Sequence, residues 1–188
     1  MTLINVRYST YEEFESERKN TDERLEFIDG VIYMSPSPDI KHQEISSYLH
    51  AQLYNLLRGS KCKVFAAPTD VVFNNVNNDE KKKVVPDLFV ACNQDNFTEN
   101  EYVGAPVFII EILSPSSKSH DMITKLNLYM NFGVKEYWIV DPMESHIMVY
   151  FLDKDLEIQF NLVNLGEDVI SNLFKEFKIN TSELFNPS

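Results

Sequence analysis

The sequence predicts one α/β or α+β domain, residues 1–188, with a central mixed β-sheet that helices flank. Its 188 residues suffice for a single domain with a sizeable core. Hydrophobic residues make up 44% and charged residues 24%, which is an ordinary globular composition. Segments with a strand period of two are interspersed with segments of helical period, as expected for helices that pack on a sheet.

The expected elements begin with a short helix and end in a mixed tail. They are a helix from Thr10 to about Arg18, two strands in 25–34, a helix from Asp39 to about Arg58, strands at 61–68, 69–75, 84–90 and 106–116, a helix over 117–132, strands at 136–142 and 146–152, and a shorter strand and a last helix ending near 182–185. Thr10 and Asp39 suit N-cap positions, and Gly59 and Gly133 stop the helices before them. Asp29-Gly30 is a two-residue hairpin signal.

The net charge of −12 argues against a protein that coats DNA non-specifically, because duplex binding relies on neutralising phosphates. The charge is uneven along the chain. Residues 41–90 carry seven Lys or Arg and five Asp or Glu, whereas residues 141–188 carry three and nine. The acidity of the C-terminal part therefore leaves room for a more neutral or basic face elsewhere.

The two cysteines, Cys62 and Cys92, lack the spacing of a zinc site and indicate reduced thiols. No apolar run approaches the length that spans a bilayer. The N-terminal segment is acidic and lacks the basic-then-apolar order of a signal peptide. Together these features predict a cytoplasmic protein with no membrane partner.

Two carboxylates stand out because each interrupts an apolar strand. Asp87 lies in VVPDLFV (84–90), directly after Pro86, and Glu111 lies in FIIEILS (108–114). A buried carboxylate is costly unless something neutralises it. If the two strands are neighbours, both side chains can face one site, where a hard divalent cation such as Mg²⁺ or Mn²⁺ would keep both ionised.

The helix after Glu111 offers a third group. Asp121, Lys125 and Tyr129 are four residues apart and share one face, so Lys125 can project over the carboxylates. A lysine near a metal-bound water can stabilise a forming hydroxide or the charge that builds on a phosphate.

The motifs in combination resemble the Uma two family, a branch of the PD-(D/E)XK nuclease superfamily. They are VVPDLFV, FIIEILSPS, the Asp-X-X-X-Lys of 121–125, GVKEYWIVDP (133–142) and the upstream RLEFIDG (24–30). The resemblance runs from about Tyr11 to Leu152. It implies a restriction-endonuclease-like core over about 11–152, a C-terminal extension over 153–188, and metal-dependent endonuclease activity on DNA.

The resemblance also implies roles for single residues. Asp87, Glu111 and the backbone carbonyl of Ile112 would bind the metal, Lys125 would orient or deprotonate the attacking water, and Glu26 would be an accessory acid. His42 matches a position often seen in the family. One departure is that Leu113 stands where the superfamily pattern has its lysine, and Lys125 on the following helix is the matching residue. Substrate contacts are expected from His42, Ser114 and the basic run Lys81, Lys82 and Lys83.

Structural roles remain open for the same residues. Asp87 can cap a turn or pair with a lysine, and Glu111 can form an ion pair with Lys125. Glu26 can lie on the solvent face of a strand, and His42 can be a surface residue near a helix start. A nuclease-fold protein that binds nucleic acid or a partner without cutting is therefore the alternative function.

A homodimer is expected because nucleases of this fold often cut two strands as symmetric pairs. The segment HIMVYF (146–151) is the candidate interface.

Overall fold

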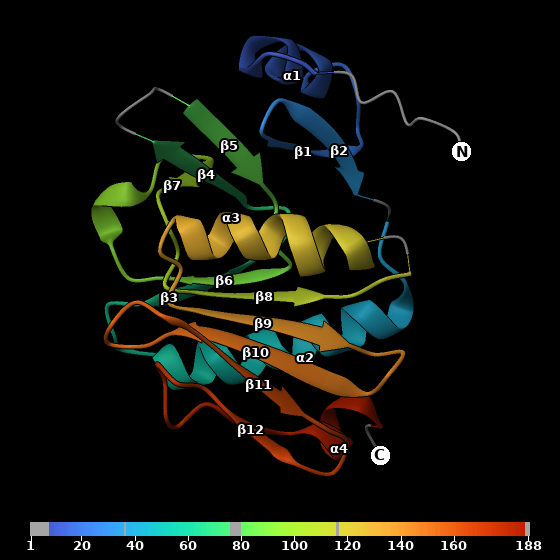
Figure 1. Ribbon diagram of the computed structural model, residues 1–188, viewed down its shortest axis with the longest axis vertical. Coiled ribbons are helices and arrows are strands. Elements are labelled where there is room, and N and C mark those ends of the chain that lie inside the picture. Colours follow the sequence, from blue (N-terminus) through green and yellow to red (C-terminus); the bar gives the residue numbers. More distant parts are fainter. Residues whose placement is uncertain (1–7, 36, 76–79, 116, 187–188) are drawn as a thin grey trace.

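The protein folds into two β-sheets with helices packed against them (Figure 1). The computed structural model describes residues 8–35, 37–75, 80–115 and 117–186. The helical elements are α1 (Tyr11–Arg18), α2 (Ile40–Leu57), η1 (Gln94–Asn96), the π-helical η2 (His120–Lys125), α3 (Leu126–Asn131) and α4 (Thr181–Phe185). The strands are β1 (Arg24–Ile28), β2 (Val31–Ser35), β3 (Lys63–Ala66), β4 (Asp70–Asn75), β5 (Glu80–Val84), β6 (Leu88–Ala91), β7 (Glu101–Val103), β8 (Phe108–Ile112), β9 (Glu136–Asp141), β10 (His146–Leu152), β11 (Ile158–Val163), β12 (Asp168–Ile170) and β13 (Lys178–Asn180). None of these described helices is long and apolar enough to cross a membrane.

The larger sheet has the strand order β11-β10-β9-β8-β6-β3, and the smaller sheet has the order β2-β1-β5-β4-β7. In the larger sheet β8 and β9 run parallel and the other described pairs are antiparallel, so the sheet is mixed. The predicted mixed α/β or α+β class is confirmed. The larger sheet is the expected central mixed sheet, and the described strands add a second, five-stranded sheet and the short β12–β13 ladder, which the sequence did not predict.

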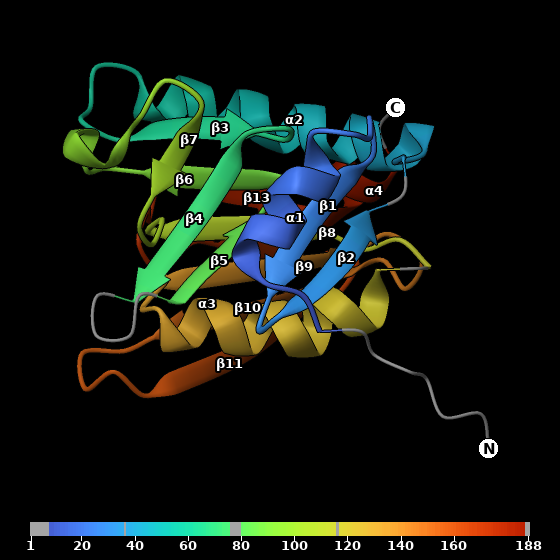
Figure 2. The same cartoon turned by 90° about the horizontal axis from the view of Figure 1, so that it is seen from above.

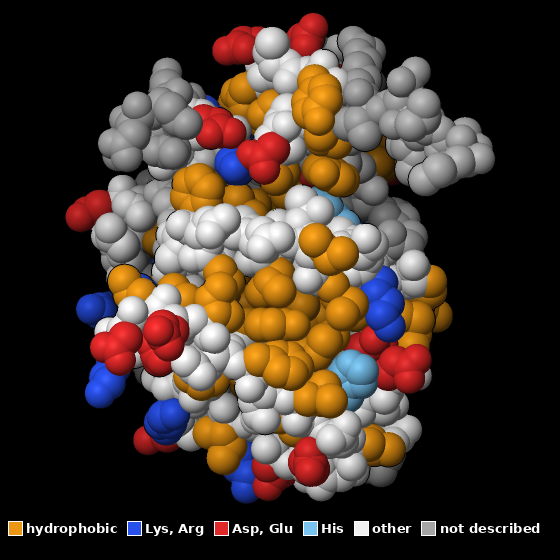
Figure 3. All heavy atoms as spheres, viewed as in Figure 1, with side chains coloured by type: hydrophobic (Ala, Val, Ile, Leu, Met, Phe, Trp, Pro, Cys, Tyr) orange, Lys and Arg blue, Asp and Glu red, His pale blue; other side chains and the backbone are white. Residues whose placement is uncertain are grey.

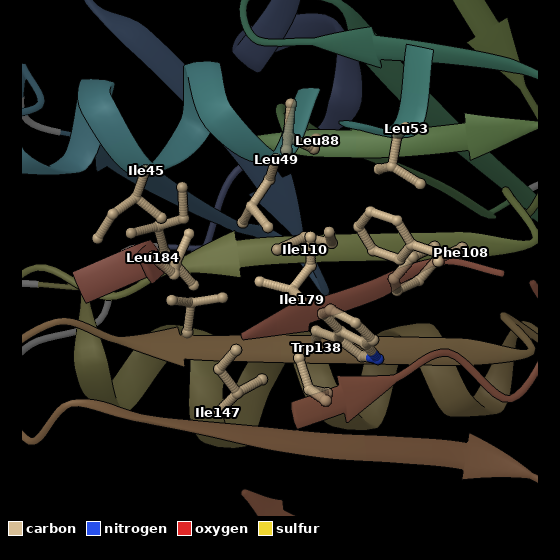
Figure 4. Close-up of a cluster of buried hydrophobic side chains, with 14 of the residues drawn as sticks. Ile45, Leu49, Leu53, Leu88, Phe108, Ile110, Trp138, Ile147, Ile179 and Leu184 are labelled. Atoms are coloured by element: carbon tan, nitrogen blue, oxygen red, sulfur yellow. The ribbon is translucent and has the colours of Figure 1, made fainter. Parts of the chain in front are cut away.

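The larger sheet is buried on both faces. Helix α2 packs on one face, where Leu49 and Leu53 meet Ile110 and Trp138 (Figure 4). Helix α3 and the smaller sheet cover the other face, and Figure 2 shows α2 and α3 on opposite sides of the strands. Burial on both faces explains why β8 and β9 are nearly continuous apolar runs. Trp138 of β9 is fully buried in this core and so has a packing role.

The segment VVPDLFV, expected as one strand, is divided between the two sheets. Val84 ends β5 in the smaller sheet, and Leu88 begins β6 in the larger one. Pro86 lies between them and has no N–H to offer a ladder, which suits a break in strand pairing. Asp87 therefore stands where the chain passes from one sheet to the other.

The two cysteines form a disulfide, so the prediction of reduced thiols is wrong. The antiparallel β3–β6 register pairs Lys63 with Ala91, and Cys62 and Cys92 follow directly in the same register. The separation of 30 residues hid this pairing in the sequence. The cytoplasmic location, which rested partly on reduced thiols, stays a prediction.

Glu136 is a fully buried carboxylate at the start of β9. Its carboxylate accepts hydrogen bonds from the Trp138 indole, the Ser171 hydroxyl and the backbone N–H groups of Asn172 and Leu173. Glu136 therefore fastens the C-terminal extension to the larger sheet.

Candidate active site

A cavity of about 170 Å³ lies at the junction of the two sheets and η2. Asp87, Glu111 and Lys125 all line it, although they come from three separate segments of the chain. The convergence expected of these three residues is therefore present in the structure.

The break at Pro86 explains why two carboxylates gather here. The N–H of Val85 donates to Glu26 Oε1 at 2.8 Å, and the N–H of Asp87 donates to Glu111 Oε2 at 3.1 Å. Backbone donors that leave a ladder inside a protein need other acceptors. Glu26 and Glu111 supply them on either side of the proline.

Lys125 is 4% exposed and is surrounded by carboxylates. Its Nζ lies 3.0 Å from Glu26 Oε1, 3.0 Å from Glu111 Oε1 and 3.3 Å from Asp121 Oδ1. Burial alone would lower the pKa of the Lys125 ammonium, but the three carboxylates outweigh burial and raise that pKa well above its ordinary value. The protonated, positively charged form of Lys125 is therefore favoured. The π-helical geometry of η2, a local form frequent at functional sites, presents it to the cavity.

Glu111 is held from both sides. Oε1 accepts from Lys125 Nζ and from the Tyr129 hydroxyl at 2.8 Å, while Oε2 accepts the N–H of Asp87. Burial raises the pKa of the Glu111 carboxyl well above its ordinary value; the charge on Lys125 opposes this rise, and neighbouring carboxylates add to it. The ion pair between Glu111 and Lys125, left open by the sequence, is present.

Asp87 is the most accessible of the site carboxylates, with 14% of its side chain exposed. Oδ2 accepts the N–H of Ile112 at 2.8 Å and lies 3.0 Å from His42 Nε2. Burial would lower the pKa of His42, but its hydrogen bond and attraction to Asp87 outweigh burial and raise that pKa. Both contacts use Oδ2, so within the described segments Oδ1 has no protein partner.

Glu26 is fully buried, so the solvent-facing alternative for this residue is wrong. It contacts Lys125 and lies 3.0 Å from His120 Nε2, and the His120 ring stacks on Tyr33 at 4.1 Å. Burial would raise the pKa of the Glu26 carboxyl, but Lys125 and His120 outweigh it and lower that pKa to about 2. Glu26 does not itself line the cavity, and its place is behind Lys125.

Two histidines line the cavity, and each uses Nε2 on a carboxylate. The sequence offered two readings of His42, a substrate contact or a surface residue near a helix start. The structure buries His42, which is 8% exposed, so it is not a surface residue. His120 was missed, although it directly precedes Asp121. The Nδ1 atoms of both rings are buried and have no partner in the described part of the chain.

The remaining expected substrate contacts divide into two groups. Ser114 lines the cavity. The three lysines do not line it. Lys82 pairs with Asp29 and Lys83 pairs with Glu15 and Glu101, while Lys81 lies over the Tyr11 ring. Lys81 and Lys83 lie over the Tyr11 ring of α1, whereas Lys82 lies over the Phe132 ring on the opposite face of β5, and all three lie outside the cavity.

The donor set suits a hard divalent cation by charge and by chemistry. Three carboxylates surround Lys125, namely Glu26, Glu111 and Asp121, and a fourth, that of Asp87, belongs to the residue whose N–H binds Glu111. Burial and mutual repulsion raise the pKa values of the Glu111 and Asp121 carboxyls. A bound cation would offset this repulsion and favour the ionised carboxylates. Among the described residues, no group of three or more His, Cys, Asp or Glu side chains is arranged so that it could hold a metal ion by itself. Water and substrate oxygens would have to complete the coordination.

Comparison with known proteins defines the class. A crystal structure described as a "putative nuclease belonging to DUF820" from Anabaena variabilis superposes with a TM-score of 0.71 and 23% identity, over 90% of this chain and 96% of that one. The two chains therefore share a fold.

The sequence itself gives the family. Residues 8–182 match the family Uma2, described as "Putative restriction endonuclease", and the chain belongs to this family. The uncharacterized protein slr1290 of Synechocystis sp. is 26% identical over 145 residues, which cover 77% of this chain and 74% of the relative. The resemblance noted in the motifs is thereby confirmed.

Proposed function

We propose that the protein is a metal-dependent endonuclease that hydrolyses DNA phosphodiester bonds in the cavity of Asp87, Glu111 and Lys125. The convergence of these three residues in one cavity carries the proposal. Membership of a family described as restriction endonucleases supports it.

Asp87, Glu111 and the backbone carbonyl of Ile112 would hold a Mg²⁺ or Mn²⁺ ion. Carboxylate and carbonyl oxygens are the ligands such ions prefer, and Asp87 Oδ1 has no competing partner among the described residues. When bound, the ion would supply an activated water and offset charge on the scissile phosphate. In the reaction, a water oxygen bonds to phosphorus while the bond from phosphorus to the leaving sugar oxygen breaks, and that oxygen receives a proton.

Lys125 acts in this proposal as a fixed positive charge. Because the surrounding carboxylates raise its pKa above the ordinary value, the protonated form of Lys125 is favoured. Of the two roles suggested by the sequence, this charge state supports orienting the water over deprotonating it. An ammonium preorganised in a buried site stabilises charge that develops on the phosphate more strongly than one in water.

The other residues of the site position these three. Glu26 and Asp121 hold the Lys125 ammonium, and the Tyr129 hydroxyl donates to the same oxygen of Glu111 as Lys125 does. His42 fixes Oδ2 of Asp87, which leaves Oδ1 for the ion. These contacts restrict the side chains to one arrangement, as an active site requires.

The test is cleavage of supercoiled plasmid in the presence of Mg²⁺ or Mn²⁺. Wild type is expected to nick the plasmid, and Asp87→Asn is expected to lose this activity while keeping its fold by circular dichroism. Asp70→Asn is the matched control, because Asp70 is a 9% exposed strand carboxylate paired with Arg18 outside the cavity. Equal nicking by wild type and Asp87→Asn would refute the proposal.

A second function, nucleic-acid binding without cleavage, is favoured by one observation. The Lys125 ammonium already neutralises Glu111, and Leu113 occupies the usual motif position of the lysine. This function predicts that DNA binds to wild type and stays intact with either ion.

Dimerisation is part of the proposal, with a corrected interface. HIMVYF forms β10, an internal strand paired on both sides, so its edges are not available. The neighbouring β11 is the sheet edge, contains no charged residue, and exposes Ile158, Phe160 and Leu162 on one face. Figure 3 shows hydrophobic side chains gathered over this part of the molecule. An uncharged apolar edge strand suits pairing with a second copy about a two-fold axis. The substitution Phe160→Asp is therefore expected to convert a dimer into a monomer, as measured by the molar mass in light scattering.

A further inference from the structure

A second hollow, of about 580 Å³, opens from the catalytic cavity along α2. The two share Arg24, His42 and Asp87 in their walls. Helix α2 forms one wall of this second hollow, and the end of β3 with Pro68 forms the other. Figure 2 shows α2 and β3 side by side.

One face of α2 carries a row of side chains that starts at the catalytic cavity. His42, Ser46, His50 and Tyr54 are each four residues apart and so lie one above another. His50 and Tyr54 stack, with ring centroids 6.3 Å apart and an angle of 14° between planes. At 1.5 Å per residue the row is about 18 Å long. Tyr54 at its far end is 57% exposed, so an aromatic face is presented to solvent.

A third hollow, of about 420 Å³, continues beyond Tyr54. Its walls include Arg58 at the end of α2 and Lys63 at the start of β3. Among the described residues, Asp87 is the single Asp or Glu in the walls of the second and third hollows. In a chain of net charge −12 this track is therefore unusually free of negative charge.

We propose that this track, the α2 groove, binds one strand of a polynucleotide that runs from the catalytic cavity past Tyr54 to Arg58 and Lys63. A base stacks on the exposed ring of Tyr54, which His50 supports from below. Phosphates beyond that base lie near Arg58 and Lys63. The assignment of the cavity end to the scissile phosphate rests on the proposed nuclease function; the binding along α2 does not.

The chemistry of the groove favours a single strand over a duplex. An exposed aromatic platform combined with cations along a groove is the usual means of holding single strands, because any base offers a face for stacking. In a duplex the bases are already stacked on each other.

The direction of the strand follows from charge. Another hollow lies beside the α2 groove and shares Pro38, Gln43 and Ser47 with it. The walls of this other hollow include two acidic residues, Asp39 and Glu44. A polyanion is repelled there. The strand therefore continues toward Tyr54 and Arg58.

The first experiment measures binding without catalysis. Fluorescence anisotropy of a labelled oligothymidylate of about twelve nucleotides, a length within the range of known single-strand sites, is recorded in EDTA. Tyr54→Ala is expected to weaken binding about tenfold, whereas Tyr54→Phe keeps the ring and binds like wild type. Lys63→Gln is expected to reduce the slope of log K against log salt by about 0.7, the value for one phosphate of a single strand. Lys175→Gln, an exposed lysine on the C-terminal extension, should leave it unchanged.

The second experiment locates the strand. An oligonucleotide with a single 5-iodouracil is irradiated with the protein, and the crosslinked peptide is sequenced. A crosslink at Tyr54 supports the proposal, and crosslinks confined to residues outside the α2 groove overturn it. Parallel oligodeoxythymidylate and oligouridylate arms identify whether the bound strand is DNA or RNA, and binding of either one supports the groove.

The outcomes separate this inference from the nuclease function. If single strands bind through Tyr54 and Lys63 but plasmid stays intact, the groove stands and the nuclease proposal fails. If wild type cuts plasmid while Tyr54→Ala and Lys63→Gln bind oligonucleotide as wild type does, the groove is wrong and the nuclease stands. Tighter binding of a duplex than of a single strand, unaffected by Tyr54→Ala, also overturns the groove.

Discussion

Replacing Lys125 by methionine tests the electrostatics of the site most sharply. The substitution keeps a long side chain but removes the ammonium that three buried carboxylates share. The side chains of Glu26, Glu111 and Asp121 are 0%, 3% and 4% exposed, so water cannot replace the lost charge. Removing one partner from a buried ionic cluster costs about 3–5 kcal/mol. We expect Lys125→Met to lower the free energy of unfolding at neutral pH by this amount, a large fraction of the stability of a typical domain.

The loss should depend on pH in a definite direction. In wild type, Lys125 helps to hold the pKa of Glu26 at about 2, well below its ordinary value of 4.5. Without Lys125 the depressed pKa of Glu26 rises, and the folded-state pKa values of Glu111 and Asp121, already above their ordinary values, rise further. Such groups bind more protons in the folded state, so their contribution to stability is fully present below the unfolded pKa and is lost as pH rises. The deficit of Lys125→Met should therefore be larger at pH 8 than at pH 5.

Urea unfolding followed by circular dichroism at the two pH values measures this deficit. Lys83→Met is the matched control, because Lys83 is 5% exposed and also bridges two carboxylates, at 2.7 and 3.1 Å. Its partners, Glu15 and Glu101, have side chains 31% and 29% exposed, so water can solvate them when the lysine is removed. We expect a smaller and less pH-dependent loss. A deficit for Lys125→Met below about 1 kcal/mol, or one equal at both pH values, would refute the reasoning.

Three further predictions concern the rest of the molecule. Glu136→Gln removes the charge from a buried carboxylate that accepts four hydrogen bonds, and should lower the free energy of unfolding by about 2 kcal/mol in urea titrations; no loss would mean that the C-terminal extension is held by other contacts. Cys62→Ser should lower it by about 3–4 kcal/mol, as expected for a disulfide that closes a loop of 30 residues, and dithiothreitol should lower the Tm of wild type but not of the variant. Mn²⁺ should raise the Tm of wild type in a concentration-dependent manner by binding the folded state, and Asp87→Asn should abolish this rise; an equal rise in both would place the ion elsewhere.

Much of the larger sheet could be predicted from the sequence. Apolar runs at β8 and β9 and the four-residue spacing of Ile45, Leu49 and Leu53 on α2 follow from burial, which is local in its signature. The separation into two sheets could not be predicted, because a strand period does not show which sheet a strand joins. The break at Pro86 and the pairing of Cys62 with Cys92 depend in the same way on long-range register.

The candidate site was predictable where a residue conflicted with its surroundings. Asp87 and Glu111 stood out because each interrupts an apolar run, and helical spacing connected Lys125 to Tyr129. Glu26 and His120 gave no such signal. Glu26 alternates normally with its neighbours, and its partners Val85 and His120 are distant in the chain. The basic run at 81–83 was expected to contact the substrate, but it lies outside the cavity. Charge density in the sequence does not show that Lys82 and Lys83 are already paired with acidic side chains.

The most direct test of the central claim is anomalous diffraction from crystals soaked in Mn²⁺. The account predicts a manganese peak bound by Asp87 and Glu111, and no such peak in crystals of Asp87→Asn. A cavity without manganese, in which Lys125 remains on Glu111 at saturating Mn²⁺, would contradict it.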